Sequence, residues 1–328
     1  MATIKDVAKL ANVSTATVSR VLNSNGYVNH STKVRVNESI EKLNYRPNDV
    51  ARSLFKGRSK MIALFVPDIM NPFFPELARA VEDMTNRHGY TFVLCNTDDS
   101  IEKELTYFNA LQQKSVDGII VVSSSITNNY LDTIDTPIIA LDRKLSSSLP
   151  SVTVNNRVGA REAVRHLKAT GCKRIAHLCG PDSVSNTTQR MRGYLDEVKD
   201  TEWFLSSYIA SGEYNFEKAM EATTALLTAH PEIDGIFVAN DVMGVGALKA
   251  AEALGIHVPN ELSIIGYDGI ALGNTTTPSL TTMAQPIYEI GTRAAEMLIK
   301  QINDPSHRPK NEELSVRLIE RQSTKARR

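Results

Sequence analysis

Apolar and polar positions follow two different patterns along this chain, one before residue 60 and another after it. In the first stretch, apolar residues recur every three or four positions in two runs with a polar break between them: Ile4, Val7, Ala8 and Ala11, then Val18, Val21 and Leu22. Such spacing predicts a helix, a tight turn and a second helix. Ser14 stands where its hydroxyl can accept a hydrogen bond from a free amide of the second helix, so we expect it to be the N-cap.

A third amphipathic run is expected to form a helix from its cap Ser31 to about Leu43, with Val34, Ile40 and Leu43 on the apolar side. Residues 47–57 then carry a proline early and a glycine at the end, which outlines one more short helix. Helices of fewer than ~12 residues are marginal in water. This last helix should therefore form only against a partner.

After residue 60 the pattern changes to short apolar runs that alternate with amphipathic ones. Runs of strand length occupy 61–66, 92–95, 118–122, 138–141, 175–178, 235–238 and 262–265. Helical patterns between them include 74–88, 101–113, 158–170, 215–229 and 242–254. This alternation predicts an α/β body with parallel sheets wrapped in helices. Split between two sheets, the strands would form two lobes with a cleft at their carboxyl ends.

The charge is distributed unevenly along a chain that is neutral overall. Residues 1–60 hold eleven Lys or Arg against four Asp or Glu, a net charge of +7, and because the whole chain has 37 of each, the remainder carries −7. A short pair of amphipathic helices is often an ordinary packed pair, but a basic head favours a polyanion such as nucleic acid. On the second helix, small polar groups and one arginine could approach base edges and phosphates in a major groove: Thr15, Ala16, Thr17, Ser19 and Arg20.

Length and composition indicate a multidomain protein of the cytoplasm. A chain of 328 residues with 42% hydrophobic residues suggests two or three domains with sizeable cores. We find neither a run of ~20 apolar residues nor the apolar stretch of a signal peptide, so we expect a soluble, cytoplasmic protein. Cys95, Cys172 and Cys179 form no CxxC pair, which fits reduced core thiols better than a disulfide or zinc site. No nucleotide loop follows a strand, and we expect no metal and no cofactor.

Polar and aromatic residues gather where four of the expected strands end. Asn71, Phe73 and Phe74 follow the first strand, and other groups follow the fourth, sixth and seventh: Asp142 with Arg143, Asn240, and Asp268. Taken singly, an Asn or Asp after a strand is more often a helix cap or a turn residue, and the phenylalanines could be ordinary core. Together at one edge, aromatic rings and charged groups suit a small polyhydroxylated ligand.

Three segments of the head resemble the lactose/galactose repressor family: Ile4-Lys-Asp-Val-Ala8, Val13-Ser-Thr-Ala-Thr-Val-Ser-Arg-Val-Leu-Asn23 and Asn44-Tyr-Arg-Pro-Asn48. The body is similar to periplasmic sugar-binding proteins, with Asn71-Pro-Phe-Phe74 and Leu141-Asp-Arg143 closest to the ribose-binding type. Within the family, the opening octapeptide and residues 51–56 are most similar to regulators of ribose operons. The resemblance implies a helix-turn-helix head at 1–46, a hinge helix and linker at 47–60, and a two-lobed body at 61–328. Its N-lobe would span about 61–158 and 288–318, and its C-lobe about 159–287 and 319–328.

The same resemblance assigns residues to DNA and to an effector. Contacts with a pseudo-palindromic operator are expected from Thr3, Ser14, Thr15, Ala16, Thr17, Ser19, Arg20, Asn23, Asn48, Ala51, Arg52 and Leu54. The resemblance also implies a homodimer whose two hinge helices pair, with Leu54 inserted as a wedge into the central base step. The effector contacts are expected from Asn71, Phe73, Phe74, Asp142, Arg143, Arg190, Tyr214, Asn240, Asp268 and Gln285. Tyr214 departs from the phenylalanine of the ribose-binding type, and its extra hydroxyl could favour another sugar.

The resemblance implies a transcriptional repressor of a ribose, or pentose, utilisation operon that the sugar releases from its operator. Ribose 5-phosphate, a hexose, a purine or a phosphorylated protein corepressor remains as an alternative effector. A transport receptor would have no use for a basic head. A glycoside-active enzyme is disfavoured because Arg143 should hold Asp142 ionised, and no GxSxG or HExxH signature occurs.

Overall fold

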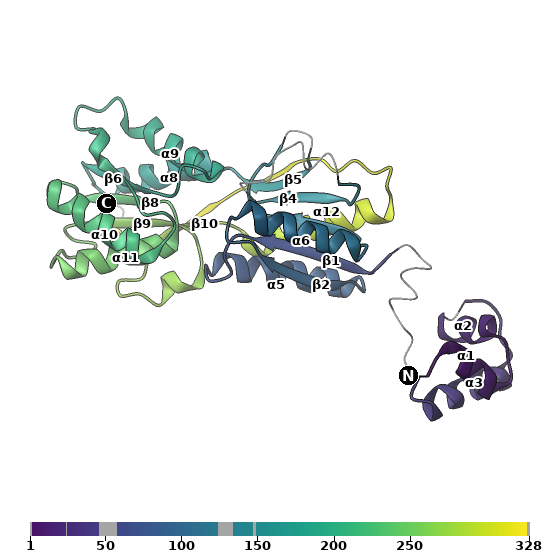
Figure 1. Ribbon diagram of the computed structural model, residues 1–328. Coiled ribbons are helices and arrows are strands. Elements are labelled where there is room, and N and C mark those ends of the chain that lie inside the picture. Colours follow the sequence, from purple (N-terminus) through teal and green to yellow (C-terminus); the bar gives the residue numbers. More distant parts are fainter. Residues whose placement is uncertain (1, 24, 46–57, 124–133, 147–148, 327–328) are drawn as a thin grey trace. The chain divides into compact units, whose positions relative to one another are not determined.

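The structure is a computed structural model, and it describes residues 2–23, 25–45, 58–123, 134–146 and 149–326. The chain forms two compact units, Met1–Ser59 and Lys60–Arg328 (Figure 1). We call the first unit the head and the second the body. The expected hinge residues Asn48, Ala51, Arg52 and Leu54 lie outside the described residues.

The described residues of the head form three helices, α1 (Ile4–Ala11), α2 (Thr15–Asn23) and α3 (His30–Lys42), around a small apolar core. Val7, Val18 and Val36 are fully buried at its centre. The expected cap of α2 is confirmed, because the amide of Thr17 donates to Ser14 Oγ at 3.1 Å. The helix, turn and helix read from the sequence therefore form as predicted.

The third helix differs from its prediction at its start and on its apolar side. It begins at His30, and the cap is Asn29, whose Oδ1 accepts from the amide of Ser31 at 3.0 Å. Ser31 therefore lies in the first turn. Val34 is 43% exposed, whereas Val36 is buried. Residues two apart point to nearly opposite sides of a helix, so only one of these two valines can face the core.

The body contains two six-stranded sheets, one in each lobe (Figure 1). The N-lobe sheet is parallel throughout, and its order is β11 (Glu312–Leu314), β5 (Ser151–Val154), β4 (Ile138–Leu141), β3 (Gly118–Val121), β1 (Met61–Val66) and β2 (Thr91–Asn96). The C-lobe sheet has the order β12 (Arg317–Ile319), β10 (Thr281–Ala284), β9 (Ser263–Asp268), β8 (Gly235–Val238), β6 (Ile175–Cys179) and β7 (Ile209–Ser211). In this sheet only β12 runs antiparallel to its neighbour.

Helices cover both faces of each sheet because strand side chains alternate between faces. In β1, Ile62 and Leu64 pack with α5 (Phe73–Arg87) and α12 (Ile287–Asn303), while Phe65 packs with α6 (Ile101–Gln113) on the other face. In the C-lobe, α8 (Asn156–Ala169) and α9 (Ser185–Val198) cover one face, and α10 (Phe216–Ala229) and α11 (Asp241–Ala253) cover the other. Two short 3-10 helices, η1 (Ser206–Tyr208) and η2 (Ala271–Asn274), complete the C-lobe.

All seven predicted strands are present, but five further strands were not predicted: β5, β7, β10, β11 and β12. Each of these has only three or four residues, and most contain Thr, Ser, Glu or Arg. The predicted strands β3, β4 and β8 are equally short, but they are almost entirely apolar, whereas polar residues interrupt the missed strands and leave no apolar run to recognise.

The chain passes between the lobes three times, and these crossings position the cleft. They follow β5, follow β10, and separate β11 from β12. Helix α8 already packs on the C-lobe from Asn156, and β12 joins the C-lobe sheet at Arg317, slightly ahead of the boundaries expected from the sequence. Among the residues described, none of the helices combines the length and the apolar character that a bilayer crossing demands.

Candidate functional site

The two lobes of the body enclose a cavity of about 400 Å³. All ten residues that the sequence assigned to an effector line it: Asn71, Phe73, Phe74, Asp142, Arg143, Arg190, Tyr214, Asn240, Asp268 and Gln285. Nine further residues complete the wall: Pro67, Asp68, Asp98, Asp99, Pro181, Val184, Asn186, Glu213 and Asn215. Both lobes thus contribute residues that follow the carboxyl ends of their strands.

Two phenylalanines at the start of α5 supply the apolar part of the N-lobe wall. The rings of Phe73 and Phe74 lie edge to face, with centroids 5.2 Å apart and an interplanar angle of 87°. Both side chains are buried in the core beneath the cavity. Asn71 fixes the helix start, because its Oδ1 accepts from the amide of Phe73 at 3.1 Å. A small molecule in the cavity would meet a rigid aromatic surface here.

Asp142 follows β4 and bridges the two lobes. Its Oδ2 accepts from Asn186 Nδ2 of α9 at 2.9 Å, and Arg143 Nε lies 3.7 Å from the same oxygen. Its Oδ1 is buried and accepts no hydrogen bond from the described residues. Burial raises the pKa of Asp142, and Arg143 and Arg190 only oppose this effect. Arg143 does favour the ionised form of Asp142, as expected, but burial outweighs this effect and the net shift of the pKa is upward.

Arg190 projects from α9 and is held by several groups at once. Its Nε donates to Asn156 Oδ1 at 2.8 Å, and its Nη1 lies 3.3 Å from Asp268 Oδ1. The guanidinium carbon also lies 3.8 Å from the centroid of the Tyr267 ring. Such a planar, fixed donor group suits hydroxyl recognition. Arg192, the other arginine of this segment, is exposed and does not line the cavity.

Asp268 ends β9 and is the second carboxylate inside the cavity. Its Oδ1 accepts from Gln285 Nε2 at 2.8 Å, and the Oε1 of Gln285 is buried without a hydrogen-bond donor among the described residues. Burial raises the pKa of Asp268 to about 6, and the positive charge of Arg190 opposes this shift. Asn240 lines the cavity and also caps α11, since its Oδ1 accepts from the amide of Met243 at 2.9 Å. The structural and the binding interpretations of Asn240 are thus compatible.

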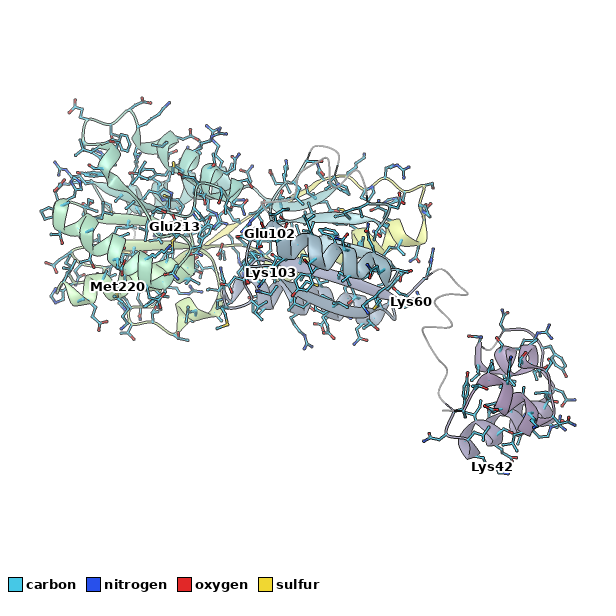
Figure 2. All side chains as sticks on the ribbon, viewed as in Figure 1. Lys42, Lys60, Glu102, Lys103, Glu213 and Met220 are labelled. Atoms are coloured by element: carbon cyan, nitrogen blue, oxygen red, sulfur yellow. The ribbon has the colours of Figure 1, made fainter. Side chains whose placement is uncertain are left out.

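The loop between β7 and α10 supplies Glu213, labelled in Figure 2, and Tyr214. Both residues have φ of 53°, in the left-handed region that side chains rarely adopt. Thr187 Oγ1 donates to the Tyr214 hydroxyl at 3.0 Å. A Cβ at Gly180 would lie 2.4 Å from Cζ of Tyr214, so the ring needs a glycine there. The extra hydroxyl of Tyr214 is therefore bonded to the protein itself.

The sequence did not predict Asn186 or the carboxylates at positions 68, 98, 99 and 213 as cavity residues. Asn186 precedes Arg190 by one helical turn and so lies on the same side of α9, a spacing that could have revealed it. The carboxylates sit in turns after β1, β2 and β7, where acidic residues are common for local reasons.

In the head, the predicted DNA-binding residues fall into two groups. Thr15, Ala16 and Arg20 are exposed, and Thr17 and Ser19 are half-buried. The others make local contacts: Thr3 Oγ1 donates to Asp6 in a capping box at the start of α1, Ser14 caps α2, and Asn23 Nδ2 donates to the carbonyl of Ser19 at 2.8 Å. The first group therefore offers an accessible polar surface along α2.

Comparisons with known proteins agree with this architecture. The model for bacterial regulatory proteins of the lacI family matches residues 3–48, and that for a periplasmic binding protein-like domain matches residues 164–324. The chain is 47% identical over 325 residues to the ribose operon repressor of Halalkalibacterium halodurans, covering 99% of this chain and 98% of that protein. It is 39% identical to the ribose operon repressor of Bacillus subtilis, over 91% of both chains.

Solved structures are similar as well. The lac repressor dimer bound to operator and the anti-inducer ONPF superposes with a TM-score of 0.90 at 26% identity, over 99% of both chains. A lacI family regulator from Enterococcus faecium with bound ribose has a TM-score of 0.73 at 29% identity, over 81% of this chain and 98% of that chain. A helix-turn-helix head joined to a two-lobed body with a polar cleft defines a ligand-responsive DNA-binding regulator. This chain belongs to the lacI family of bacterial regulatory proteins and is a transcriptional regulator rather than an enzyme.

Proposed function

We propose that this chain is the repressor of a ribose utilisation operon, and that D-ribose in the interlobe cavity releases it from its operator. The observation that carries the proposal is a partly open polar cavity between the lobes, whose wall includes Asp142 and Gln285, each with one buried acceptor oxygen (Oδ1 and Oε1) that no described residue satisfies. A buried polar group without a partner costs about 1–3 kcal/mol. A rotation of either side chain toward the cavity would let a sugar hydroxyl satisfy its oxygen. The 47% identity to a ribose operon repressor supports ribose as the sugar.

The cavity has the two kinds of surface that a sugar requires. The rings of Phe73 and Phe74 can cover its C–H patches, while Asp142 and Asp268 accept from hydroxyls and Arg190 donates to them. A sugar with a misplaced hydroxyl would leave a charged group unpaired, which excludes it by about 1–3 kcal/mol per group. Recognition is therefore specific for the positions of the hydroxyls.

The charge of the wall favours a neutral sugar over a phosphate ester. Among the described residues that line the cavity, two arginines face six carboxylates: Asp68, Asp98, Asp99, Asp142, Glu213 and Asp268. A phosphoryl group would bring a further negative charge into this wall and would be repelled. Ribose 5-phosphate is accordingly disfavoured as the effector.

The switch couples two binding equilibria in one dimer. In this proposal, residues 1–46 of each protomer bind one half of a pseudo-palindromic operator. Residues 47–60 form a hinge helix that pairs with the partner's hinge and places Leu54 in the central base step. Residues 61–328 bind the sugar and form the dimer, and the protein acts in the cytoplasm. The related lac repressor is a dimer on its operator. Ribose favours one arrangement of the lobes in which the hinges do not pair, so ribose weakens DNA binding by the factor by which DNA weakens ribose binding.

Two substitutions separate the two activities. Arg20→Ala should weaken specific operator binding by roughly 1–3 kcal/mol and leave ribose affinity unchanged. Asp268→Ala should abolish the ribose response and leave operator binding intact, because it removes an acceptor of the cavity in the body, whereas the proposed operator contacts belong to the head and the hinge. Electrophoretic mobility shifts with and without ribose measure both effects.

The matched controls are Arg35→Ala, which removes another exposed head arginine, and Asp200→Ala, which removes an exposed carboxylate outside the cavity. Loss of both activities in either site variant, with folding retained by circular dichroism, would contradict the assignment of roles.

A further inference from the structure

We propose that Asp241, which does not line the cavity, is the positioning residue that holds the sugar-binding carboxylate of Asp268 in place. The inference rests on the proposed function, since it concerns how one ribose contact is built. Asp241 opens α11, directly after the cavity residue Asn240, and its side chain is completely buried. The geometry of its hydrogen bonds carries the inference.

The carboxylate of Asp241 binds the backbone immediately after Asp268. Its Oδ2 accepts from the amide of Gly269 at 2.7 Å and from that of Ile270 at 3.0 Å. Its Oδ1 accepts from Thr282 Oγ1 of β10 at 2.7 Å. A carboxylate in the first turn of a helix commonly serves that helix. These three bonds instead run to the end of β9 and to the neighbouring strand.

The segment that Asp241 holds has an unfavourable backbone conformation. Asp268 has φ of 108°, a value that residues with a side chain rarely adopt, and the following residue, Gly269, has φ of 82°, which glycine allows. A strained residue of this kind persists only when its surroundings fix it. One side of the segment is fixed by the amide of Gln285, which donates to the carbonyl of Asp268 at 2.9 Å. Asp241 fixes the other side.

Strand β9 has a glycine where the carboxylate of Asp241 approaches it. A Cβ at Gly266 would lie 2.2 Å from Asp241 Oδ1 and 3.0 Å from Leu280 Cδ2, so no other residue leaves room. The close approach lets one carboxylate reach β9, β10 and the residues after β9 together. The side chain of Asp268 is thus directed into the cavity because the buried carboxylate of Asp241 fixes the backbone of the two residues that follow it, Gly269 and Ile270.

Three variants separate positioning from general stability. Asp241→Ala leaves two buried amides without an acceptor, and the residues after Asp268 should shift. Asp241→Asn keeps an oxygen for the amides of Gly269 and Ile270, and its amino group can donate to Thr282 Oγ1. Leu227→Ala is the matched control, because Leu227 is a buried core residue of α10 that contributes nothing to the cavity wall. It lowers stability without removing any of the hydrogen bonds that Asp241 accepts from Gly269, Ile270 and Thr282.

Calorimetric titration of the full-length variants with D-ribose measures the effect, at a temperature where circular dichroism shows each to be folded. We expect Asp241→Ala to raise the Kd about tenfold or more, Asp241→Asn to restore it to within about fivefold of the wild type, and Leu227→Ala to stay within about threefold. If Asp241 acts through Asp268, adding Asp241→Ala to Asp268→Asn should change the Kd little further. Wild-type affinity in folded Asp241→Ala, or fully additive losses in the double variant, would overturn the inference.

A measurement without ligand keeps this inference distinct from the proposed function. Hydrogen exchange of the peptide that contains residues 268–270 should be slow in the ligand-free wild type and in Asp241→Asn, and clearly faster in Asp241→Ala. Equal exchange in all three would overturn the positioning role whatever the effector is. Faster exchange in Asp241→Ala together with no ribose binding by the wild type would retain the positioning role and reject ribose.

Discussion

Burial sets the chemistry of individual residues in the cavity. Asp142 and Asp268 each lie against an arginine, yet the pKa of each is raised, because removal from water outweighs the neighbouring positive charge. Asp268 also faces Arg190 from α9 and Asp142 from the opposite lobe. At the proposed ribose contact Asp268, hydroxyl binding should therefore compete with protonation near pH 6.

Ribose affinity should fall in mild acid. The pKa of Asp268 is about 6 in the ligand-free protein, and its ionised form is the better hydroxyl acceptor, so the Kd should rise by up to about tenfold per pH unit below that value. A raised carboxyl pKa makes the folded state bind the proton more tightly than the unfolded state, so this group adds stability as the pH falls. Weaker binding at pH 5 is thus not acid unfolding. Calorimetry from pH 7.5 to 5 measures the effect, and a constant Kd would contradict it.

Tyr267 supports Arg190 through its ring and not through its hydroxyl. The guanidinium lies over the ring, whereas the hydroxyl is buried and finds no partner among the described residues. Tyr267→Phe should therefore keep ribose affinity and raise the free energy of unfolding by about 1 kcal/mol, measured by urea denaturation. Tyr267→Leu, which removes the ring, should weaken ribose binding. Destabilisation by Tyr267→Phe would show that the hydroxyl does have a partner.

At the scale of elements, the sequence predicted the strands with unbroken apolar runs and missed the short strands that contain polar residues. Ser151–Val154 and Arg317–Ile319 have too few apolar positions to show a period, and their pairing is decided by neighbouring strands. Residues such as Asp142 and Asp268 could be placed at the cavity because they directly follow recognisable strands. Asn186 lies within α9, a helix that the apolar pattern did not reveal. That the ten lining residues bind the effector stays a prediction.

The packing of α9 against α8 should determine the positions of two cavity residues together, since α9 carries both Asn186 and Arg190. A Cβ at Gly193 would lie 2.3 Å from the carbonyl oxygen of Arg157 on α8. Gly193→Ala should push the helices apart, cost about 1–3 kcal/mol of stability and weaken ribose binding, although alanine favours helix formation by about 1 kcal/mol. Arg192→Ala is the control, because that residue of α9 is exposed. Thermal unfolding and calorimetry measure both effects, and wild-type behaviour of Gly193→Ala would refute the close packing.

At the scale of the whole molecule, two units of opposite net charge serve two kinds of binding, one to DNA and one to a small ligand. The head holds ten Lys or Arg against four Asp or Glu in residues 1–59, a net charge of +6 that suits DNA, while the acidic body holds the cavity that we propose takes a neutral sugar. Neither unit alone accounts for regulation. The proposed function requires that occupancy of the cavity change the affinity of the head for its operator, typically by about 5–150-fold.

The most direct test needs an operator duplex, which the protein can select from a random DNA library. The preformed complex of the protein with this labelled duplex is titrated with D-ribose while the fluorescence anisotropy of the label is measured. We predict that D-ribose releases the duplex in a saturable manner, and that the same concentrations of ribose 5-phosphate do not. Anisotropy that stays constant or rises with D-ribose would contradict the claim that ribose in this cavity releases the repressor from DNA.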